Sequence, residues 1–421
     1  MDGIIEADQY VLIRLPSSTL RLIKLSQNAT VNLGKFGSFK ADEIIGLPFG
    51  YTYEIQDGGN GTVDHHDEGT DKRQDEIIGT NELTVDDPTV QRLSMQEIEQ
   101  LKKTASANEI IARVIESHAG FNQKTIFSKQ KYTRRKQQKF LKRFTPCQVG
   151  SSEIIEYFQY KQHSRILELT LESLGLIMSL ANVRPGGNYI VLDDTGGLIT
   201  GAMMERMGLS GKKTTNDDDD DNHGSILFVH ENEHANFDTL KFMNFSDQVI
   251  NHTVKTINLL QLFHPQEEEP VKILSDDVIS NMKPARRGQY YRRLHRHAEL
   301  SAIFQNLTSG FYDGLILATT LDLSSSLLDK LLTGLAGSRQ VVIYNPAKEP
   351  LVNYSHALMR DLRVLAPTIL ESRVRKYQVY PGRTHPVMTM QSGGGYVLWG
   401  TRVLPSSDVR AGGKKRRKPN Q

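Results

Sequence analysis

The chain has 421 residues, 38% of them hydrophobic, so it can bury substantial cores and we expect two or three domains. Its formal net charge of +2 conceals a strong segregation, because acidic and basic residues cluster in separate stretches. The single cysteine, Cys147, excludes an internal disulfide and a thiolate zinc site, and it favours a reducing compartment. Acidic residues near the start and the lack of an apolar run of ~18 residues argue against a signal peptide and a membrane span.

The N-terminal region, residues 1–92, predicts a small antiparallel β-barrel or sandwich. Between Tyr10 and Ile55, the segments VLIRLP, LRLIKL, ATVNL and YTYEI alternate apolar with polar residues and are separated by turn residues. Residues 57–88 are rich in Gly, Asp, Glu and Thr and have few apolar anchors. We therefore expect a disordered loop there that interrupts the domain.

Residues 93–150 predict a helical connector with a basic segment. Ser94 and Glu97 match a capping box, and apolar residues at helical spacing follow up to Ser117. After Glu116 the sequence has no acidic residue until Glu153, and within that window cations accumulate at Lys124, Lys129, Lys131, Arg134, Arg135, Lys136, Lys139, Lys142 and Arg143. This density predicts phosphate contacts with RNA; the alternative is a solvated basic helix. The aromatic residues Tyr132, Phe140 and Phe144 could anchor the segment or stack on unpaired bases.

Residues 151–405 alternate between helical and strand-like stretches, which predicts a mostly parallel sheet with helices on both faces. The expected helices are 153–160, 169–181, 198–207, 236–242, 327–334 and 353–365, and the expected strands are 189–192, 226–229, 315–318 and 341–344. Two polar insertions, 210–224 and 265–296, should be surface excursions that are partly disordered. Residues 406–421 predict a disordered tail whose run Lys414–Lys418 resembles a nuclear-import signal.

The segment NYIVLDDTGGLITGAMMERMG, residues 188–208, predicts a strand, a turn and a helix. In an open parallel sheet, a Gly-rich turn at this place lets the backbone approach a nucleotide-like cofactor. A turn that binds S-adenosylmethionine normally reads acidic-x-Gly-x-Gly-x-Gly, whereas Asp193 is followed here by only Gly196 and Gly197 in a shortened turn. Glu231, after the next strand, stands where such folds place an acid for the ribose hydroxyls. We expect a relic turn that does not bind the cofactor.

Two further sequence patterns could indicate catalytic residues, but the elements and residues expected around them do not support catalysis. His230 to His234 matches the zinc-protease pattern H-E-x-x-H, which requires a helix, yet a strand precedes it and only His234 is expected to begin a helix. The strand that ends at Ala318 is followed by Thr319 and Thr320, with no carboxylate to act as a general base on an amino group. Asp322 is close in sequence, but we expect it to cap a helix.

The C-terminal half contains two more candidate RNA contacts. A second basic cluster lies in the insertion 265–296 and includes Arg286, Arg287, Arg292 and Arg293 together with two tyrosines. Near the end, residues 380–399 contain three consecutive glycines without the Lys-Ser/Thr of a phosphate loop, so we expect a hairpin. Either its glycines only permit tight packing, or Arg383 and His385 reach across a subunit interface toward a substrate.

Several long segments, in order, resemble the eukaryotic non-catalytic subunit of tRNA (adenine-N1) methyltransferase, which acts on the T-loop adenosine at position fifty-eight. They are NLGKFGSFKADEIIGLPFG (32–50), YTRRKQQKF (132–140), GGLITGAMMERMG (196–208), HENEHAN (230–236), YDGLILATTL (312–321) and GRTHPVMTMQSGGGYVLW (382–399). The resemblance implies an N-terminal β-barrel followed by a class I, Rossmann-like methyltransferase fold with a degenerate cofactor site.

The resemblance also implies a partner and a division of labour. A catalytic subunit would bind S-adenosylmethionine, this chain would bind no cofactor, and two copies of each would form a nuclear heterotetramer on tRNA. The RNA contacts we predict are Lys124, Lys129, Lys131, Tyr132, Arg134, Arg135, Lys136, Lys139, Arg286, Arg287, Arg292, Arg293, Thr320, Arg373, Arg375, Arg383 and His385. Two alternatives stay open: an active methyltransferase with a non-standard loop, and a general RNA-binding or translation-initiation scaffold.

Overall fold

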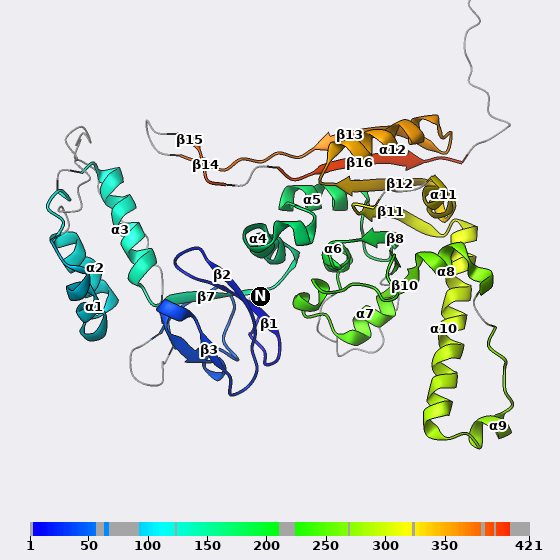
Figure 1. Ribbon diagram of the computed structural model, residues 1–421, viewed down its shortest axis with the longest axis horizontal. Coiled ribbons are helices and arrows are strands. Elements are labelled where there is room, and N and C mark those ends of the chain that lie inside the picture. Colours follow the sequence, from blue (N-terminus) through cyan, green and yellow to red (C-terminus); the bar gives the residue numbers. More distant parts are fainter. Residues whose placement is uncertain are drawn as a thin grey trace, which may run out of the picture. The chain divides into compact units, whose positions relative to one another are not determined.

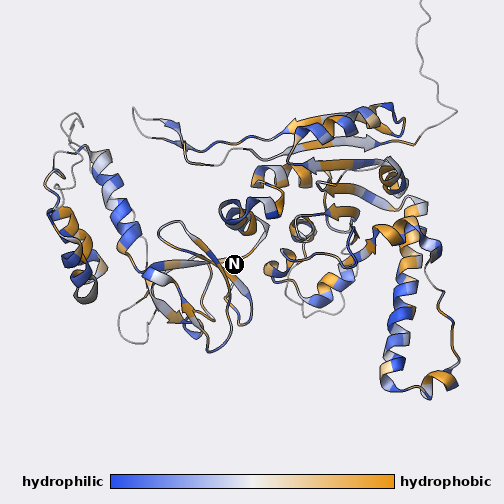
Figure 2. Ribbon diagram, viewed as in Figure 1, coloured by the Kyte–Doolittle hydropathy of each residue, from blue (hydrophilic) through white to orange (hydrophobic). Residues whose placement is uncertain are grey.

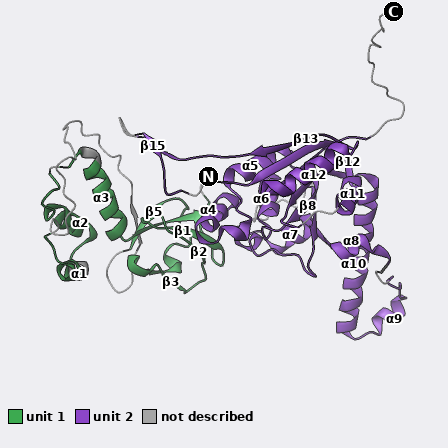
Figure 3. Cartoon of the chain, turned by 45° about the horizontal axis from the view of Figure 1, so that its top comes forward, with its two compact units in different colours: residues 1–149 green, residues 150–421 purple. Residues whose placement is uncertain are grey.

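The computed structural model describes residues 3–55, 63–66, 92–122, 124–209, 224–267, 270–321, 325–379, 384–390 and 393–404. The chain divides into two compact units, residues 1–149 and 150–421 (Figure 3). Each unit encloses a hydrophobic core of its own. None of the described helices is both long and apolar enough to cross a membrane.

The first unit is built on a five-stranded antiparallel sheet in the order β2-β1-β7-β5-β6. Its strands are β1 (Tyr10–Arg14), β2 (Leu20–Lys24), β5 (Thr52–Ile55), β6 (Val63–His66) and β7 (Arg143–Gln148). A ribbon of β3 (Thr30–Asn32) and β4 (Ser38–Lys40) and two short 3-10 turns, η1 (Gly34–Phe36) and η2 (Ala41–Glu43), complete it. Inward-facing side chains such as Ile13 form the core, where the Phe39 and Phe144 rings stack with centroids 4.4 Å apart.

A closed N-terminal barrel is not confirmed, because the sheet has β2 and β6 as its edge strands. The domain also extends beyond the predicted boundary at residue 92. Strand β7, from the expected connector, lies between β1 and β5 in the middle of the sheet. Strand β6 lies within the loop predicted to be disordered, residues 57–88, where the other residues lie outside the described part of the chain. Strand β7 pairs with β1, which lies more than a hundred residues earlier in the sequence, so the pairing itself left no local signal.

Three helices of the first unit form a small separate core. They are α1 (Met95–Thr104), α2 (Ala107–Glu116) and α3 (Ile126–Phe140). The predicted capping box at Ser94 is confirmed, since Ser94 and Glu97 satisfy each other's backbone N–H groups. Phe140 at the end of α3 packs against buried apolar residues of α2 such as Ile111.

The second unit contains a seven-stranded sheet in the order β10-β9-β8-β11-β12-β16-β13 (Figure 1). Its strands are β8 (Asn188–Asp193), β9 (Ser225–His230), β10 (Val254–Asn258), β11 (Tyr312–Ala318), β12 (Leu335–Asn345), β13 (Val364–Glu371) and β16 (Tyr396–Arg402). The five strands from β10 to β12 are parallel, and β16 is antiparallel to both of its neighbours. One antiparallel strand inserted near the edge of an otherwise parallel sheet is the topology of a class I methyltransferase fold. The four predicted strands are confirmed within it.

Helices cover both faces of this sheet, as predicted. They are α4 (Ser151–Lys161), α5 (Leu171–Leu180), α6 (Leu198–Arg206), α7 (Asp247–Thr253), α8 (Leu259–Phe263), α9 (Asp276–Ser280), α10 (Pro284–Ser309), α11 (Ser325–Thr333) and α12 (Lys348–Arg360). Short 3-10 turns are η4 (His163–Ile166), η5 (Leu240–Met243) and η6 (Pro265–Glu267), and a two-stranded ribbon joins β14 (Tyr377–Gln378) to β15 (His385–Pro386). Helices α8, α10, α11 and α12 share one core cluster with the strands.

The prediction for this unit differs from the structure in three places. The helix expected at residues 353–365 is α12, Lys348–Arg360, which ends five residues earlier. In the insertion 265–296, residues 284–296 form the first half of α10, a helix of 26 residues that the sequence pattern did not predict. Buried Leu300, Ile303 and Leu307, spaced three and four apart, anchor the second half of this helix to the core. The helix expected at residues 236–242 is reduced to the 3-10 turn η5. Residues 210–223 and the tail 405–421 lie outside the described residues.

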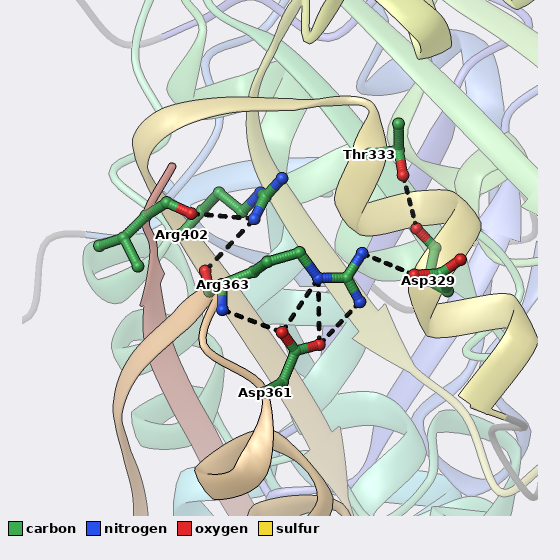
Figure 4. A network of polar contacts seen from close by, with 6 residues as sticks. Asp329, Thr333, Asp361, Arg363 and Arg402 are labelled. Atoms are coloured by element: carbon green, nitrogen blue, oxygen red, sulfur yellow. Dashed lines mark hydrogen bonds and ion pairs between the residues drawn. The ribbon is translucent and has the colours of Figure 1, made fainter. Parts of the chain in front are cut away.

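A polar network ties together the amino edge of the sheet (Figure 4). The Arg363 guanidinium bridges Asp361, at 2.7 Å, and Asp329 of α11, at 2.6 Å. Its hydrogen bonds hold the pKa of the Asp361 carboxyl below its usual value. Buried Arg402 donates to the carbonyl oxygens of Arg363 and Val403, which fixes the end of β16. The edge that would bind a cofactor lies at the opposite ends of the parallel strands.

Candidate functional site: a filled cofactor turn and two basic helices

The chain runs outward from β8 to β10 and then returns to β11 on the other side of β8, so the topological switch point lies between β8 and β11. Open α/β folds bind their ligands at such a point, beyond the carboxyl ends of the strands. The turn from Asp193 to Gly197 stands there, between β8 and α6, as the sequence predicts. Its geometry therefore decides whether this chain can hold a cofactor.

Asp193, the acid of this turn, points into the protein and has no free lone pair. Its side chain is buried, with 3% exposure. One carboxylate oxygen accepts the backbone N–H of Thr195, at 2.9 Å, and the Thr195 hydroxyl; the other accepts the N–H and hydroxyl of Thr200, both at 2.9 Å. A carboxylate offers about four such positions, and all are used. Burial raises the pKa of Asp193, and the four donors oppose that shift.

The space in front of the two glycines is filled by the protein itself. Gly196 and Gly197 have φ angles of +73° and +85°, which few other residues adopt. A Cβ on Gly196 would lie 2.7 Å from the Thr239 hydroxyl, and one on Gly197 would lie 3.0 Å from the Leu240 Cβ. The backbone N–H of Thr239 donates to the Gly196 carbonyl at 2.8 Å. Glycines in such a turn usually let a ligand approach the backbone closely. Here Thr239 and the first residue of η5, Leu240, make that close approach.

The neighbouring strand ends are joined by hydrogen bonds among protein groups. The Thr319 hydroxyl donates to the Asp194 carboxylate at 2.5 Å, and the Asn345 amide donates to the Thr319 carbonyl at 2.9 Å. Thr320, a predicted RNA contact, is exposed beside them. Buried Thr239 and Leu240 pack directly against Gly196 and Gly197 of the turn. Asp322, expected to cap a helix, lies outside the described residues.

The H-E-x-x-H pattern does not lie on a helix. His230 ends β9, and its Nδ1 lies 2.7 Å from the Asn232 carbonyl oxygen. Desolvation lowers the pKa of His230. The residues that follow form bends, so the helix start predicted at His234 is wrong. Without a helix the two imidazoles lack the one-turn spacing of a zinc protease. Glu231, the candidate ribose acid, is exposed.

The first basic surface is α3, which is mostly hydrophilic along its length (Figure 2). Four of the predicted cations are exposed, namely Lys131, Arg134, Arg135 and Lys139. Three others are half-buried, namely Lys129 and Lys136 of the helix and Lys124, which precedes it. Within the described part of the chain, Arg134 and Arg135 form no ion pair. These two guanidinium groups are therefore available to phosphates, in keeping with the charge pattern of the sequence.

The aromatic residues of this region anchor the helix. The Tyr132 ring contacts the His118 ring edge-on, with centroids 4.9 Å apart, and the Lys136 ammonium lies 4.8 Å from the Tyr132 centroid. Burial lowers the pKa of Lys136, and the charge of Lys139 adds to that effect. Phe140 is buried among the helices and Phe144 in the sheet. Of the two roles the sequence left open, the structure supports packing over base stacking for these rings.

The second basic surface is the exposed first half of α10. Arg286, Arg287, Arg292 and Arg293 all present exposed side chains there. This half of the helix is also mostly hydrophilic (Figure 2). The sequence located the charges, but it did not predict that a continuous helix carries them. A helix fixes the spacing of these side chains. Binding phosphates along it therefore costs less backbone conformational entropy than binding them with a mobile loop would.

In the C-terminal hairpin, two glycines pack against the protein and the described basic residues are exposed. A Cβ on Gly394 would lie 2.6 Å from the Thr170 hydroxyl, and one on Gly395 would lie 2.5 Å from the Tyr344 hydroxyl, so both glycines permit tight packing. Three predicted contacts, Arg373, Arg375 and His385, are exposed, whereas Arg383 lies outside the described residues. The hairpin extends from β13 and β16, at the opposite edge of the sheet from β10 and α10 (Figure 1). The structure thus does not bring these two groups of contacts together.

Comparison with known proteins identifies the relatives of this chain. The tRNA (adenine(58)-N(1))-methyltransferase non-catalytic subunit TRM6 of Debaryomyces hansenii is 39% identical over 454 residues, which cover 99% of this chain and 92% of that protein. The protein of the same name from Kluyveromyces lactis is 41% identical, covering 96% of this chain and 88% of its own length. Among solved structures, the tRNA (m1A58) methyltransferase TrmI of Aquifex aeolicus covers 96% of this chain at 12% identity with a TM-score of 0.48. The model of the Gcd10p family matches residues 4–283, and the chain belongs to that family.

Proposed function

We propose that this chain is the non-catalytic, tRNA-binding subunit of a tRNA (adenine(58)-N(1))-methyltransferase. The observation that carries the proposal is the filled turn at the switch point, where Asp193 is saturated and Thr239 packs on Gly196. A methyltransferase fold that cannot hold its cofactor retains two uses, assembly with an active partner and binding of the substrate. Relatives that span nearly the whole chain carry the name of a non-catalytic subunit, which agrees with this reading.

In this proposal the catalytic partner binds S-adenosylmethionine and transfers the methyl group to N1 of the adenosine. This chain binds no cofactor. Its contribution is to hold the tRNA through the exposed cations of α3, α10 and the hairpin. Most protein contacts to a structured RNA go to its backbone, which matches surfaces rich in Arg and Lys. Loss of the cations of α3 and α10 should therefore weaken tRNA binding without altering the chemistry of the partner.

Two finer features belong to the same proposal. We infer a heterotetramer with two copies of each subunit, since the paralogous partner is expected to share this fold. We also infer a nuclear location, in which the run Lys414–Lys418 acts as an import signal. A fluorescent fusion carrying alanine at these five positions should redistribute to the cytosol, whereas the parent fusion should concentrate in the nucleus.

Affinity purification of the tagged full-length chain from its native cell tests the assembly. We expect a methyltransferase subunit with an intact Gly-rich cofactor loop in equimolar amount, together with tRNA. Light scattering of the purified complex should give the mass of two copies of each. Recovery of ribosomal subunits without such a partner would instead favour the translation-factor alternative and contradict the proposal.

A further inference from the structure

A cavity of about 570 Å³ opens between α8 and the middle of α10. Its volume lies in the range of sites that bind small organic molecules. One face of α10 supplies most of the wall, at helical spacing: Gln289, Arg292, Arg293, Arg296, His297 and Leu300. The exposed Leu260 of α8 contributes an apolar surface opposite. The cavity therefore combines positive charge with flat and apolar surfaces.

Arg296 holds a fixed position between this cavity and a second one of about 330 Å³, since it lines both. One of its Nη atoms donates to the Thr256 carbonyl, at 2.9 Å, and to the Gln261 amide oxygen, at 3.1 Å. The other donates to the Glu299 carboxylate at 2.8 Å. These bonds occupy the edges of the guanidinium, yet the side chain stays 34% exposed. A guanidinium held by its edges offers its face, and that face is a surface on which a nucleobase can stack.

The charge at the cavity favours an anionic ligand. Arg292 and Arg293 lie about one turn before Arg296 on the same face of α10. No acidic side chain is among the described residues that line this cavity. Arginine presents a planar fork of donors that matches the oxygens of a phosphate. Phosphate-binding groups thus stand beside a stacking surface and an apolar wall.

We propose that this cavity receives one unpaired nucleotide of the bound RNA. The base stacks on the Arg296 guanidinium against Leu260, and a flanking phosphate pairs with Arg292. The inference rests on the proposed function, because it assumes that α10 meets RNA. It goes further by assigning to α10 a preference for single-stranded RNA. A base in a duplex has both faces covered by its neighbours and cannot enter, whereas an unpaired base has a face free to stack.

Fluorescence anisotropy with the assembled complex tests this preference. The two probes are a short labelled oligoadenylate and a labelled RNA duplex. Arg296→Lys keeps the charge but removes the plane, and it should weaken oligoadenylate binding about tenfold while duplex binding stays within about twofold. A double variant, Leu260→Ala with His297→Ala, removes two exposed wall residues without changing a fixed charge. This double variant should also lose oligoadenylate binding while it retains duplex binding. It provides an independent test in case Arg296→Lys disturbs the local fold.

A matched control removes charge from the same helix outside the cavity. Arg286→Ala with Arg287→Ala should weaken the binding of both probes by the same factor, because phosphate contacts alone do not distinguish single-stranded from double-stranded RNA. If the cavity variants bind oligoadenylate like the parent, or lose both probes equally, the nucleotide site is refuted. The parent complex is also titrated with labelled tRNA, and failure to bind it would refute the proposed function itself. Binding of tRNA without a selective effect of the cavity variants would refute only this inference.

Discussion

At the scale of one residue, Gly196 shows how tightly the turn between β8 and α6 packs against Thr239. Its φ of +73° puts it in the left-handed region, and a Cβ there would lie 2.7 Å from the Thr239 hydroxyl. Gly196→Ala should therefore lower the free energy of unfolding by roughly 2–4 kcal/mol, because backbone strain adds to overpacking. Thermal and denaturant unfolding of the full chain would measure the loss.

Gly208 provides the matched control for that experiment. It has a similar φ of +84°, but nothing lies within 4 Å of the position its Cβ would take. Gly208→Ala should cost only about 1 kcal/mol, from backbone strain alone. Equal losses in the two variants would show that Thr239 does not press on the turn, and the description of a filled cradle would then be wrong.

Individual residues at this turn were predictable from sequence only in part. The acid, the shortened glycine run and the absence of a carboxylate after β11 could all be read from residues 188–208 and 312–321. The residues that pack against the two glycines could not be predicted from the sequence. Thr239 and Leu240 lie some forty residues after Gly196, in a segment expected to be a regular helix. Only the tertiary structure shows that they pack against Gly196 and Gly197.

At the scale of elements, α3 is the predicted tRNA grip of the first unit. Arg134→Ala with Arg135→Ala removes two exposed guanidinium groups that have no ion pair within the described residues. Each phosphate contact contributes about 0.7–0.9 to the log–log slope of affinity against salt, so the slope should flatten by roughly 1.5. Stability should change by less than about 0.5 kcal/mol, because these are surface positions. A salt titration of tRNA affinity measures both the weakening and the slope.

A pair of exposed cations on α12, Lys348 and Arg360, serves as the control for α3. Their replacement by alanine changes the net charge equally but removes no predicted RNA contact. The salt slope should then match the parent. If the α12 pair flattens the slope as much as the α3 pair does, the effect arises from overall charge, and α3 has no special role.

The hairpin that carries β15 makes a different prediction, because its basic residues are proposed to reach toward the partner. Arg383→Ala with His385→Ala should depress turnover of the assembled complex while leaving the complex intact in gel filtration. Lys376→Ala removes one exposed cation from the same hairpin and should leave turnover unchanged. Normal turnover of the double variant at saturating tRNA would restrict the hairpin to a packing role like that of Gly394.

Sequence periodicity was reliable for elements that pack locally and failed for those that depend on distant partners. Four of the five parallel strands from β10 to β12 and the capping box of α1 were predicted because buried runs and caps are local signals. Strand β7 was missed because its partners, β1 and β5, lie far away in the sequence. Helix α10 was missed because its first half is exposed and polar, and only Leu300, Ile303 and Leu307 show the helical period.

For the whole molecule, the central physical expectation is that the isolated chain does not bind S-adenosylmethionine. Asp193 has no lone pair to offer, and η5 with the residue before it covers the glycines. Calorimetry of the full-length chain should therefore show no binding heat. A one-to-one isotherm with micromolar affinity, equivalent to about −8 kcal/mol, would mean that η5 moves aside and that the cradle still functions.

The most direct test of the account compares methylation by each subunit alone and by the two mixed. The substrates are unmodified initiator tRNA and S-adenosylmethionine labelled in its methyl group. A partner variant that cannot bind the cofactor serves as the control. The account predicts activity in the mixture, none from this chain alone, and none when the cofactor-deficient partner is used. Methyl transfer by this chain alone, or by its mixture with the cofactor-deficient partner, would contradict the assignment of a non-catalytic subunit.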